Sequence, residues 1–463
     1  MTDVLVLACV VIVGMISITD LRKGFYSGLI TGFLQDPLRK LMPGMPVYYT
    51  VLVGLIVAMT FIGAKLRGIP LGFRPIHAWN RNLRAPLKLF VVLVVIQSAV
   101  TFINTDSLVL SGIGLLVYLC PLPALLLAYY FAWDKADIFN FFKWYIILSI
   151  LMLSGVYLAH FGYDWRVLRS VGEALRIYTN TGIGYVDLPA GFFRAPETAA
   201  WHGGAAICLL VVLVVSKPGK GLKWLAGFSI TFILIAIIFT GRRKIILEIV
   251  LFISMYWWLL SYFQRGGTKL ANLALLLAFA GWILVTQTDV GSSTLFTELT
   301  PYFKRQVGLR QGMVDRLLGN SVYAFQWVIA QNGFFGSGAG SGSQGAQYYG
   351  GGDQLIGSAA EGGFGKVLAE LGVPGFILFL VMLYSLARYL WRVLVFMKGG
   401  DPALARLVYG MTAFLCANGI VFVTAHQVFG DPFVLLMLGW LVGFVIAAPR
   451  IQKKIVLRLN SGQ

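Results

Sequence analysis

Long apolar runs recur along this chain at short intervals, and they define the elements that the sequence predicts. Each is close to the roughly 17–24 residues that an α-helix needs to cross the hydrocarbon core of a bilayer. The pattern is typical of an all-α, polytopic integral membrane protein, in which residues 1–463 form a single transmembrane domain of about 12 helices. The predicted spans lie near 4–18, 47–64, 89–104, 108–131, 138–160, 199–216, 224–240, 245–262, 270–287, 367–387, 404–425 and 432–449.

The polar segments between the runs are unequal in length. Two of them, 161–198 and 288–366, are too long to serve as simple connections. The second becomes glycine-rich over 333–365, and long loops of this kind usually carry function. We therefore expect one large loop between helices 9 and 10, and a smaller one after helix 5, on the same side of the membrane.

The amino-acid composition also indicates an integral membrane protein, and it bears on whether the protein binds nucleic acid. Hydrophobic residues make up 58% of the chain and charged residues 12%, and the mean hydropathy is +0.80, which excludes a soluble two-domain enzyme. The formal net charge of +18 would indicate a nucleic acid in a soluble protein. In a membrane protein we attribute it to asymmetric loops, and we expect no nucleic-acid partner.

The distribution of lysines and arginines over the loops predicts the orientation of the helices across the membrane. With the N-terminus inside, the inner loops and the C-terminal tail hold 20 of the 37 lysines and arginines, which favours an N-in and C-in arrangement. Asp3 precedes the first run without a basic leading region, so we expect a retained helix there. Segment 19–46, with Asp36-Pro37-Leu38-Arg39-Lys40 among apolar residues, is expected to be an outer loop or an interfacial helix on either face. If one of the first two spans did not cross, every later orientation would invert.

The turn Thr240-Gly241-Arg242-Arg243-Lys244 then lies on the outer side, with three consecutive cations and no acid. Long cationic side chains at helix ends reach the lipid headgroups at little cost, which is the structural explanation. Guanidinium groups also bind phosphate oxygens bidentately, so Arg242 and Arg243 are candidates for a phosphate clamp. Glu248 stands one helical turn after Lys244, and we expect these two to pair and leave the arginines for a ligand.

Two more ionisable residues outside this turn, Arg194 and Glu361, have both a structural and a functional interpretation. Arg194, just before the sixth span, either pairs with Glu197 or reaches the same outer site as a second cation. Glu361, at the end of the glycine-rich segment, is either a solvated acid or a general base whose pKa is raised by apolar surroundings. Glu370 lies deeper and is expected to cap or pair within the helix region.

No pattern in the sequence predicts a cofactor. The four histidines are scattered and have no carboxylate at metal-ligand spacing, so we expect no metal site. The run from Gly336 to Gly345 contains GxGxxG, but it follows no strand and no Lys-Ser or Lys-Thr ends it, which argues against a nucleotide fold. We interpret it as a tightly turning loop, with a functional alternative in which its backbone closes over a substrate.

Three segments together resemble the O-antigen ligase and O-antigen polymerase superfamily. Ala369-Glu370-Leu371-Gly372-Val373-Pro374-Gly375-Phe376 is similar to the entry of that family into an apolar helix after its large periplasmic loop. Arg194-Ala195-Pro196-Glu197-Thr198-Ala199 resembles the arginine segment before a mid-chain helix, and Thr240-Gly241-Arg242-Arg243 resembles the Ser-Arg turn two helices later. The resemblance covers roughly 192–375.

The resemblance implies an enzyme of the bacterial inner (cytoplasmic) membrane with a GT-C-like architecture. Such an enzyme transfers a glycan from an undecaprenyl-diphosphate carrier to a growing glycan acceptor at the periplasmic face, without a metal. Arginines hold the diphosphate and a base activates the acceptor hydroxyl. Membrane lipid, a chain-length regulator and a flippase are the further partners implied.

One departure from the family decides between its members. Aligning the Glu-Leu-Gly segment puts Glu361 where the ligases have their histidine, and Gly362 where they have asparagine. We therefore favour an inverting polymerase of a capsular, exo- or O-antigen polysaccharide. In it Glu361 is the base, and Arg194, Arg242 and Arg243 hold the diphosphate. The candidate helpers are Arg305, Arg310, Lys366 and Glu197.

Two other functions stay open at this point. An O-antigen ligase, or a protein O-oligosaccharyltransferase, would share the site and differ in its acceptor. A secondary transporter is suggested by the twelve spans, but such proteins usually have repeated halves and several ionisable residues at mid-membrane depth, whereas Glu248 is the one clearly embedded acid in the sequence pattern.

Overall fold

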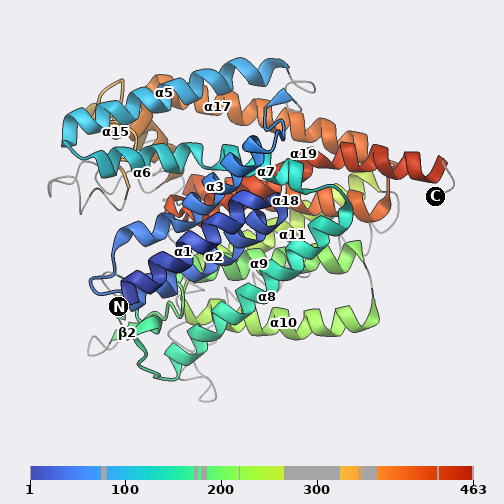
Figure 1. Cartoon of the computed structure of the whole chain (residues 1–463), viewed down its shortest axis with the longest axis horizontal. Coiled ribbons are helices and arrows are strands. Elements are labelled where there is room, and N and C mark those ends of the chain that lie inside the picture. The colour runs from blue at the N-terminus through green and yellow to red at the C-terminus, as the bar shows by residue number, and fades with distance from the viewer. Residues whose placement is uncertain are drawn as a thin grey trace.

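The computed structural model of the chain consists of long helices that mostly run along the long axis of the molecule (Figure 1). It describes residues 2–74, 81–171, 176–178, 185–217, 219–264, 324–343, 346, 362–424 and 427–460. The helices are α1 (Thr2–Thr19), α2 (Leu21–Leu41), α3 (Leu52–Leu66), α5 (Arg81–Thr105), α6 (Leu108–Leu119), α7 (Pro121–Phe131), α8 (Lys135–His160), α9 (Pro196–Ser216), α10 (Lys220–Phe239), α11 (Arg243–Phe263), α15 (Ala324–Asn332), α17 (Gly363–Met397), α18 (Pro402–Thr424) and α19 (Pro432–Asn460). Short 3₁₀ helices are η1 (Val47–Val51), η2 (Arg166–Leu168) and η7 (Gln427–Gly430).

The apolar helices confirm a polytopic membrane protein. Within the described ranges, 9 helices are long and apolar enough to cross a membrane, and the pair α6 and α7, bent by 40°, makes up to 10. The predicted span near 270–287 lies outside the described residues, as does most of the large loop. Among the described residues, the exception to the all-α prediction is a hairpin of β1 (Arg176–Tyr178) and β2 (Tyr185–Asp187) within segment 161–198.

The bundle has two distinct ends. α19 finishes at the end that we call the C-terminal end, where Lys454 forms an ion pair with Asp134 at 3.1 Å. The residue after that acid begins α8, and Lys135 pairs there with Asp401 at 2.8 Å. The opposite end, which holds the start of α1 and the hairpin, is the N-terminal end (Figure 1). The two chain termini therefore lie at opposite ends of the molecule.

α2 connects these two ends, which corrects the predicted topology. Arg22 in its first turn pairs with Asp137 at 3.2 Å, at the C-terminal end. Lys40 in its last turn donates hydrogen bonds to the carbonyls of Gly191 and Phe193, just before α9 at the N-terminal end. Segment 19–46 is thus not an outer loop or an interfacial helix. The arrangement with both termini on one side, N-in and C-in, stays a prediction, and a passage of α2 from one end of the bundle to the other is the observation that speaks against it.

A stripe of small residues lets α2 pack inside the bundle. Gly24, Gly28 and Gly32 lie one helical turn apart, on the face that meets α3 and α19. A Cβ atom at position 32 would lie 2.3 Å from ring atoms of Phe433. Small residues at this spacing are a common device for close helix contacts in membranes. The hydropathy pattern missed α2 because it depends on these glycines and carries charge near both ends.

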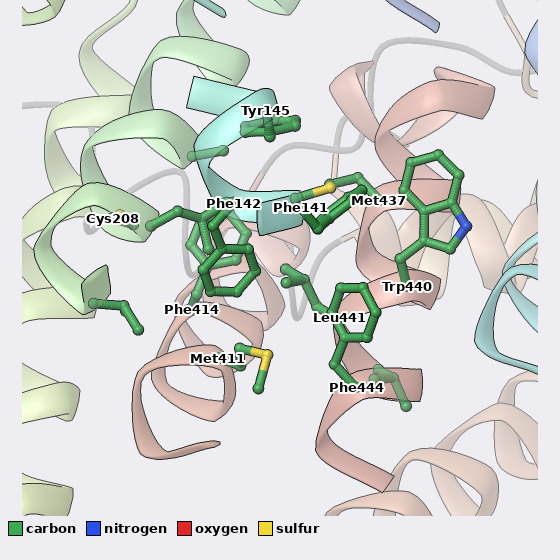
Figure 2. Packing of buried hydrophobic residues seen from close by; sticks show 14 of the residues in the cluster. Phe141, Phe142, Tyr145, Cys208, Met411, Phe414, Met437, Trp440, Leu441 and Phe444 are labelled. Atoms are coloured by element: carbon green, nitrogen blue, oxygen red, sulfur yellow. The ribbon is translucent and has the colours of Figure 1, made fainter. Parts of the chain in front are cut away.

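A large part of the buried core lies between α8, α9, α18 and α19. Phe141 and Phe142 of α8 meet Trp440 and Phe444 of α19 in a contact network of aromatic side chains (Figure 2). α9 and α19 are the most deeply buried of the candidate spans, and α5, α10 and α11 are more peripheral. The predicted site therefore lies at the start of one of the two most buried candidate spans.

Candidate anion site at the N-terminal end

Arg194 occupies the segment that leads into α9 and is held between two acids. Its backbone N–H donates to Oδ2 of Asp36 at 2.9 Å, and its guanidinium Nη2 lies 3.1 Å from Oδ2 of Asp431. Burial opposes the charge of this side chain, but Asp431 and Asp36 raise the pKa of Arg194 above its ordinary value. Arg194 is thus a permanent cation in a partly dehydrated position.

Asp431 has a second role, which explains its position. Its Oδ1 accepts the N–H of Phe433 at 2.8 Å, and Pro432 is the first residue of α19. An aspartate followed by proline is a favoured way to begin a helix, because the carboxylate accepts an N–H that has no partner in the helix. The same carboxylate therefore caps α19 and neutralises Arg194.

Lys40 fixes the backbone on the other side of Arg194. Its Nζ is fully buried and donates to the carbonyls of Gly191 at 2.7 Å, Phe193 at 2.5 Å and Val167 at 3.1 Å. An ammonium group has three donors, and here all three are used. α2 therefore holds residues 191–194 at two points, with Lys40 and with Asp36.

The turn between α10 and α11 brings Arg242 to the same place. Thr240 ends α10, and Gly241 follows with φ +65°, a left-handed conformation that glycine adopts at low cost after a helix. Arg242 comes next, as the residue that precedes α11, and its guanidinium forms an ion pair with Glu197 in the first turn of α9. Both side chains are partly exposed, at 18% and 23%.

Two helices begin at this site, and both favour a negative charge there. The residue before α9 is Ala195, whose side chain cannot cap the helix, and Glu197 supplies an acid in the first turn. α11 begins with Arg243 and Lys244 just after Arg242, so three cations stand at a helix N-terminus. Each such cation costs about 0.3–1 kcal/mol against the helix dipole. A bound anion would offset this cost, because helix N-termini and arginines both attract it.

The structure brings some of the predicted site residues together and leaves others untested. Arg242 reaches Glu197 in the first turn of α9, and the charge of Glu197 also acts on Arg194, which lies just before that helix. The predicted Arg194–Glu197 pair is replaced by ion pairs of Arg194 with Asp431 and of Arg242 with Glu197. The residues whose side chains lie outside the described part are Arg243, Arg305, Arg310 and Glu361.

The expected Lys244–Glu248 pair is also corrected. Glu248 is fully buried, and its Oε1 accepts the side-chain N–H of Asn418 at 2.8 Å. The oxygen of the same asparagine amide accepts the indole N–H of Trp201 at 2.8 Å. This carboxyl therefore links α11, α18 and α9 and does not pair with the cation one turn before it.

Lys366 belongs to a second cluster, under the glycine-rich segment. It lies 3.9 Å from Glu370, whose two oxygens accept the Tyr118 hydroxyl at 2.5 Å and the N–H of Gly342 at 2.9 Å. The expectation that Glu370 pairs within the helix region is confirmed. Lys366 is thereby used in packing the segment, and the described contacts do not join it to the two arginines.

The glycine-rich segment is anchored through a break in α17. Gly372 has φ +69°, and the helix ladder is interrupted there. The carbonyls of Ala369 and Glu370 are satisfied instead by the N–H groups of Ser337 and Gly338, at 2.8 and 3.1 Å. The segment is thus a tight turn over 336–343 held by backbone bonds, as the structural interpretation predicted. The functional alternative, in which the backbone of this segment closes over a substrate, stays a prediction.

His202 and the metal prediction can be placed in the same region. His202 is buried, stacks against Phe193 and Phe433, and shares a hydrogen bond of 2.8 Å with the Tyr145 hydroxyl. Among the described residues, no three His, Cys, Asp or Glu side chains are grouped so as to hold a metal ion. The expectation of a metal-independent site stays a prediction.

Sequence reasoning missed the three residues that hold Arg194. The sequence Asp431-Pro432 could have been recognised as a helix start, because Asp before Pro commonly begins a helix. Asp36 and Lys40 were less easily recognised, as charged residues among apolar ones. Their contacts with residues 191–194 are separated by about 150 positions and have no local pattern.

Comparison with known proteins adds no family to these observations. No protein-family model matches the chain, and no curated protein is a detectable relative.

Proposed function

We propose that this protein is a glycosyltransferase of the bacterial inner membrane that polymerises a polysaccharide from undecaprenyl-diphosphate-linked repeat units at the periplasmic face. The observation that carries the proposal is that Glu197, at the start of α9, forms an ion pair with Arg242 and also acts electrostatically on Arg194. The two arginines come from different loops, their side chains are only 16% and 18% exposed, and they lie at the end of an apolar bundle. A lipid-linked diphosphate would place its charged group at the end of such a bundle and its lipid chain in the bilayer beside the helices.

In the proposed reaction, the arginines act electrostatically. The acceptor hydroxyl attacks the anomeric carbon of the donor, the bond from that carbon to the diphosphate oxygen breaks, and configuration inverts. Negative charge grows on the leaving diphosphate as the bond breaks. Guanidinium groups already placed there stabilise the transition state without reorganisation, an effect worth about 3–4 kcal/mol for one well-placed donor.

The proton of the acceptor hydroxyl needs a base. Glu361 is proposed for this role from the resemblance, since it stands where the ligases have their histidine. The described residue nearest to it in sequence is Gly362, which precedes α17; the next residue, Gly363, lies against Phe422 near the end of α18. The proposal therefore has the base and the arginines on the same side of the membrane.

Complementation of a deletion strain tests the proposal. We expect Arg194→Ala, Arg242→Ala and Glu361→Gln each to shorten or abolish the glycan polymer, with the protein still present in the membrane. Asp164→Asn is the matched control, because it removes an exposed carboxylate paired to Arg169 at the same end. Full-length polymer from all three site variants would refute the proposal.

Mass analysis of the product distinguishes polymerase from ligase. Polymer that accumulates on the lipid carrier supports polymerisation. Transfer of a single preformed chain to lipid A or to protein would support the ligase or O-oligosaccharyltransferase alternative, which shares the same donor site.

A further inference from the structure

The two arginines of the site have counter-ions of different kinds. Asp431, the partner of Arg194, is 1% exposed and is also committed to the first turn of α19. Glu197, the partner of Arg242, is 23% exposed and stands on the first turn of α9. One carboxylate is therefore built into the fold, and the other lies at the solvent-accessible edge of the site.

Glu197 can leave its arginine at a lower cost than Asp431. Its carboxylate is partly exposed, so water can solvate it after it separates from Arg242. A buried acid that is also a helix cap has no such alternative. A glutamate side chain also has three rotatable bonds, through which its carboxylate can leave the guanidinium while the backbone of α9 stays in place.

We propose that Glu197 occupies the anion-binding position of Arg242 in the unliganded protein and that the diphosphate of the donor displaces it. Glu197 then acts as a competitor for the ligand, while Asp36 and Asp431 stay in place and keep Arg194 oriented. The inference rests on the proposed function, since it takes the arginines as the diphosphate site. It changes the assignment of Glu197 from a helper to an internal occupant of the site.

A binding experiment with inorganic pyrophosphate tests the competition. Calorimetric titration of the purified full-length protein in lipid nanodiscs gives the dissociation constant without a need for activity. We expect Glu197→Gln to bind pyrophosphate about three- to fivefold more tightly, the gain that corresponds to releasing one exposed ion pair. Glutamine keeps the size of the side chain and removes its charge.

Two controls separate competition from a general change of charge. Asp164→Asn makes the same change in net charge at the same end of the molecule, and we expect it to leave the affinity unchanged. The double variant Glu197→Gln with Arg242→Ala should show no gain over Arg242→Ala alone, because the two residues act on the same position. Thermal unfolding of each variant confirms that the fold is intact.

The outcomes are separable from those of the proposed function. Unchanged or weaker pyrophosphate binding by Glu197→Gln overturns the inference, as does a gain that persists without Arg242. The inference is also overturned if neither the wild type nor Glu197→Gln binds pyrophosphate. The glycan-length assay of Arg194→Ala and Arg242→Ala decides the function independently. Loss of polymer in those variants with no effect of Glu197→Gln on binding would keep the function and discard the competition.

Discussion

At the scale of single residues, the site is a set of charges whose partners come from distant parts of the chain. The arginines were predictable, because cations beside apolar helices stand out and their segments resemble a family pattern. Their acids were not, since Asp431 follows Arg194 by more than two hundred positions and is recognisable from sequence only as a helix cap. Long-range ion pairs leave no periodic signal.

The two roles of Asp431 can be separated by substitution. Asn keeps the oxygen that caps α19 but loses the charge, whereas Ala loses both. We expect Asp431→Asn to lower the free energy of unfolding by about 3–5 kcal/mol, because it leaves a buried arginine without its acid. Asp431→Ala should cost about 1 kcal/mol more, the value of the cap. Denaturant unfolding in mixed micelles measures both, and equal costs would contradict the capping role.

Gly241 sets the direction from which Arg242 enters the site. An alanine there must adopt φ near +65°, which costs about 1–2 kcal/mol for a residue with a Cβ atom. We expect Gly241→Ala to destabilise the protein by this amount and to weaken pyrophosphate binding. Gly227→Ala in α10 is the control, since its Cβ would meet nothing within 4 Å and alanine favours the helix.

At the scale of elements, α2 was the main error of the sequence analysis. Hydropathy recognises helices that face lipid, and α2 instead faces α3 and α19 through glycines. The other described spans were found because their apolar runs are long. Their boundaries agree with the predicted spans to within about five residues, except where α5 begins at Arg81, α17 ends at Met397 and α19 ends at Asn460. The break at Gly372 was visible only as a Gly-Val-Pro-Gly sequence.

Substitutions within the glycine stripe test how α2 packs. A Cβ atom at position 32 would lie 2.3 Å from the buried ring of Phe433, whereas one at position 28 would be 3.4 Å from Val57. We expect Gly32→Ala to cost about 1–3 kcal/mol through overpacking. Gly28→Ala should be neutral within about 0.5 kcal/mol. Similar unfolding free energies for the two variants would argue against this packing.

At the scale of the whole molecule, the described structure puts the start of α1 at the end of the bundle that also holds Arg194 and Arg242 (Figure 1). The charge count had correctly placed 161–198 and the 241–244 turn at one common end, and α2 moves only the first helix. The C-terminal end keeps the basic tail of α19 and the ion pairs of Asp134 and Asp401. The charge count and the described structure therefore agree on these two segments and differ on the start of the chain, where α2 was not predicted as a helix through the bundle.

Cysteine labelling in whole cells measures this arrangement. In a cysteine-free background, we expect Thr2→Cys and Tyr163→Cys to react with a membrane-impermeant maleimide that has access to the periplasm. Asn460→Cys should react only after the inner membrane is opened. Labelling of positions 2 and 460 from the same side would restore the shared-side topology and exclude a crossing α2.

The clamp between Lys40 and the segment before α9 has a consequence for biogenesis. α2 is synthesised 151 positions before the carbonyl of Gly191 that Lys40 binds, and Asp431 follows much later. During synthesis, α2 therefore enters the bilayer with a lysine and an aspartate that have not met their partners. Its insertion depends on its neighbours in the nascent chain, and a chain that stops before α19 leaves Arg194 without its acid.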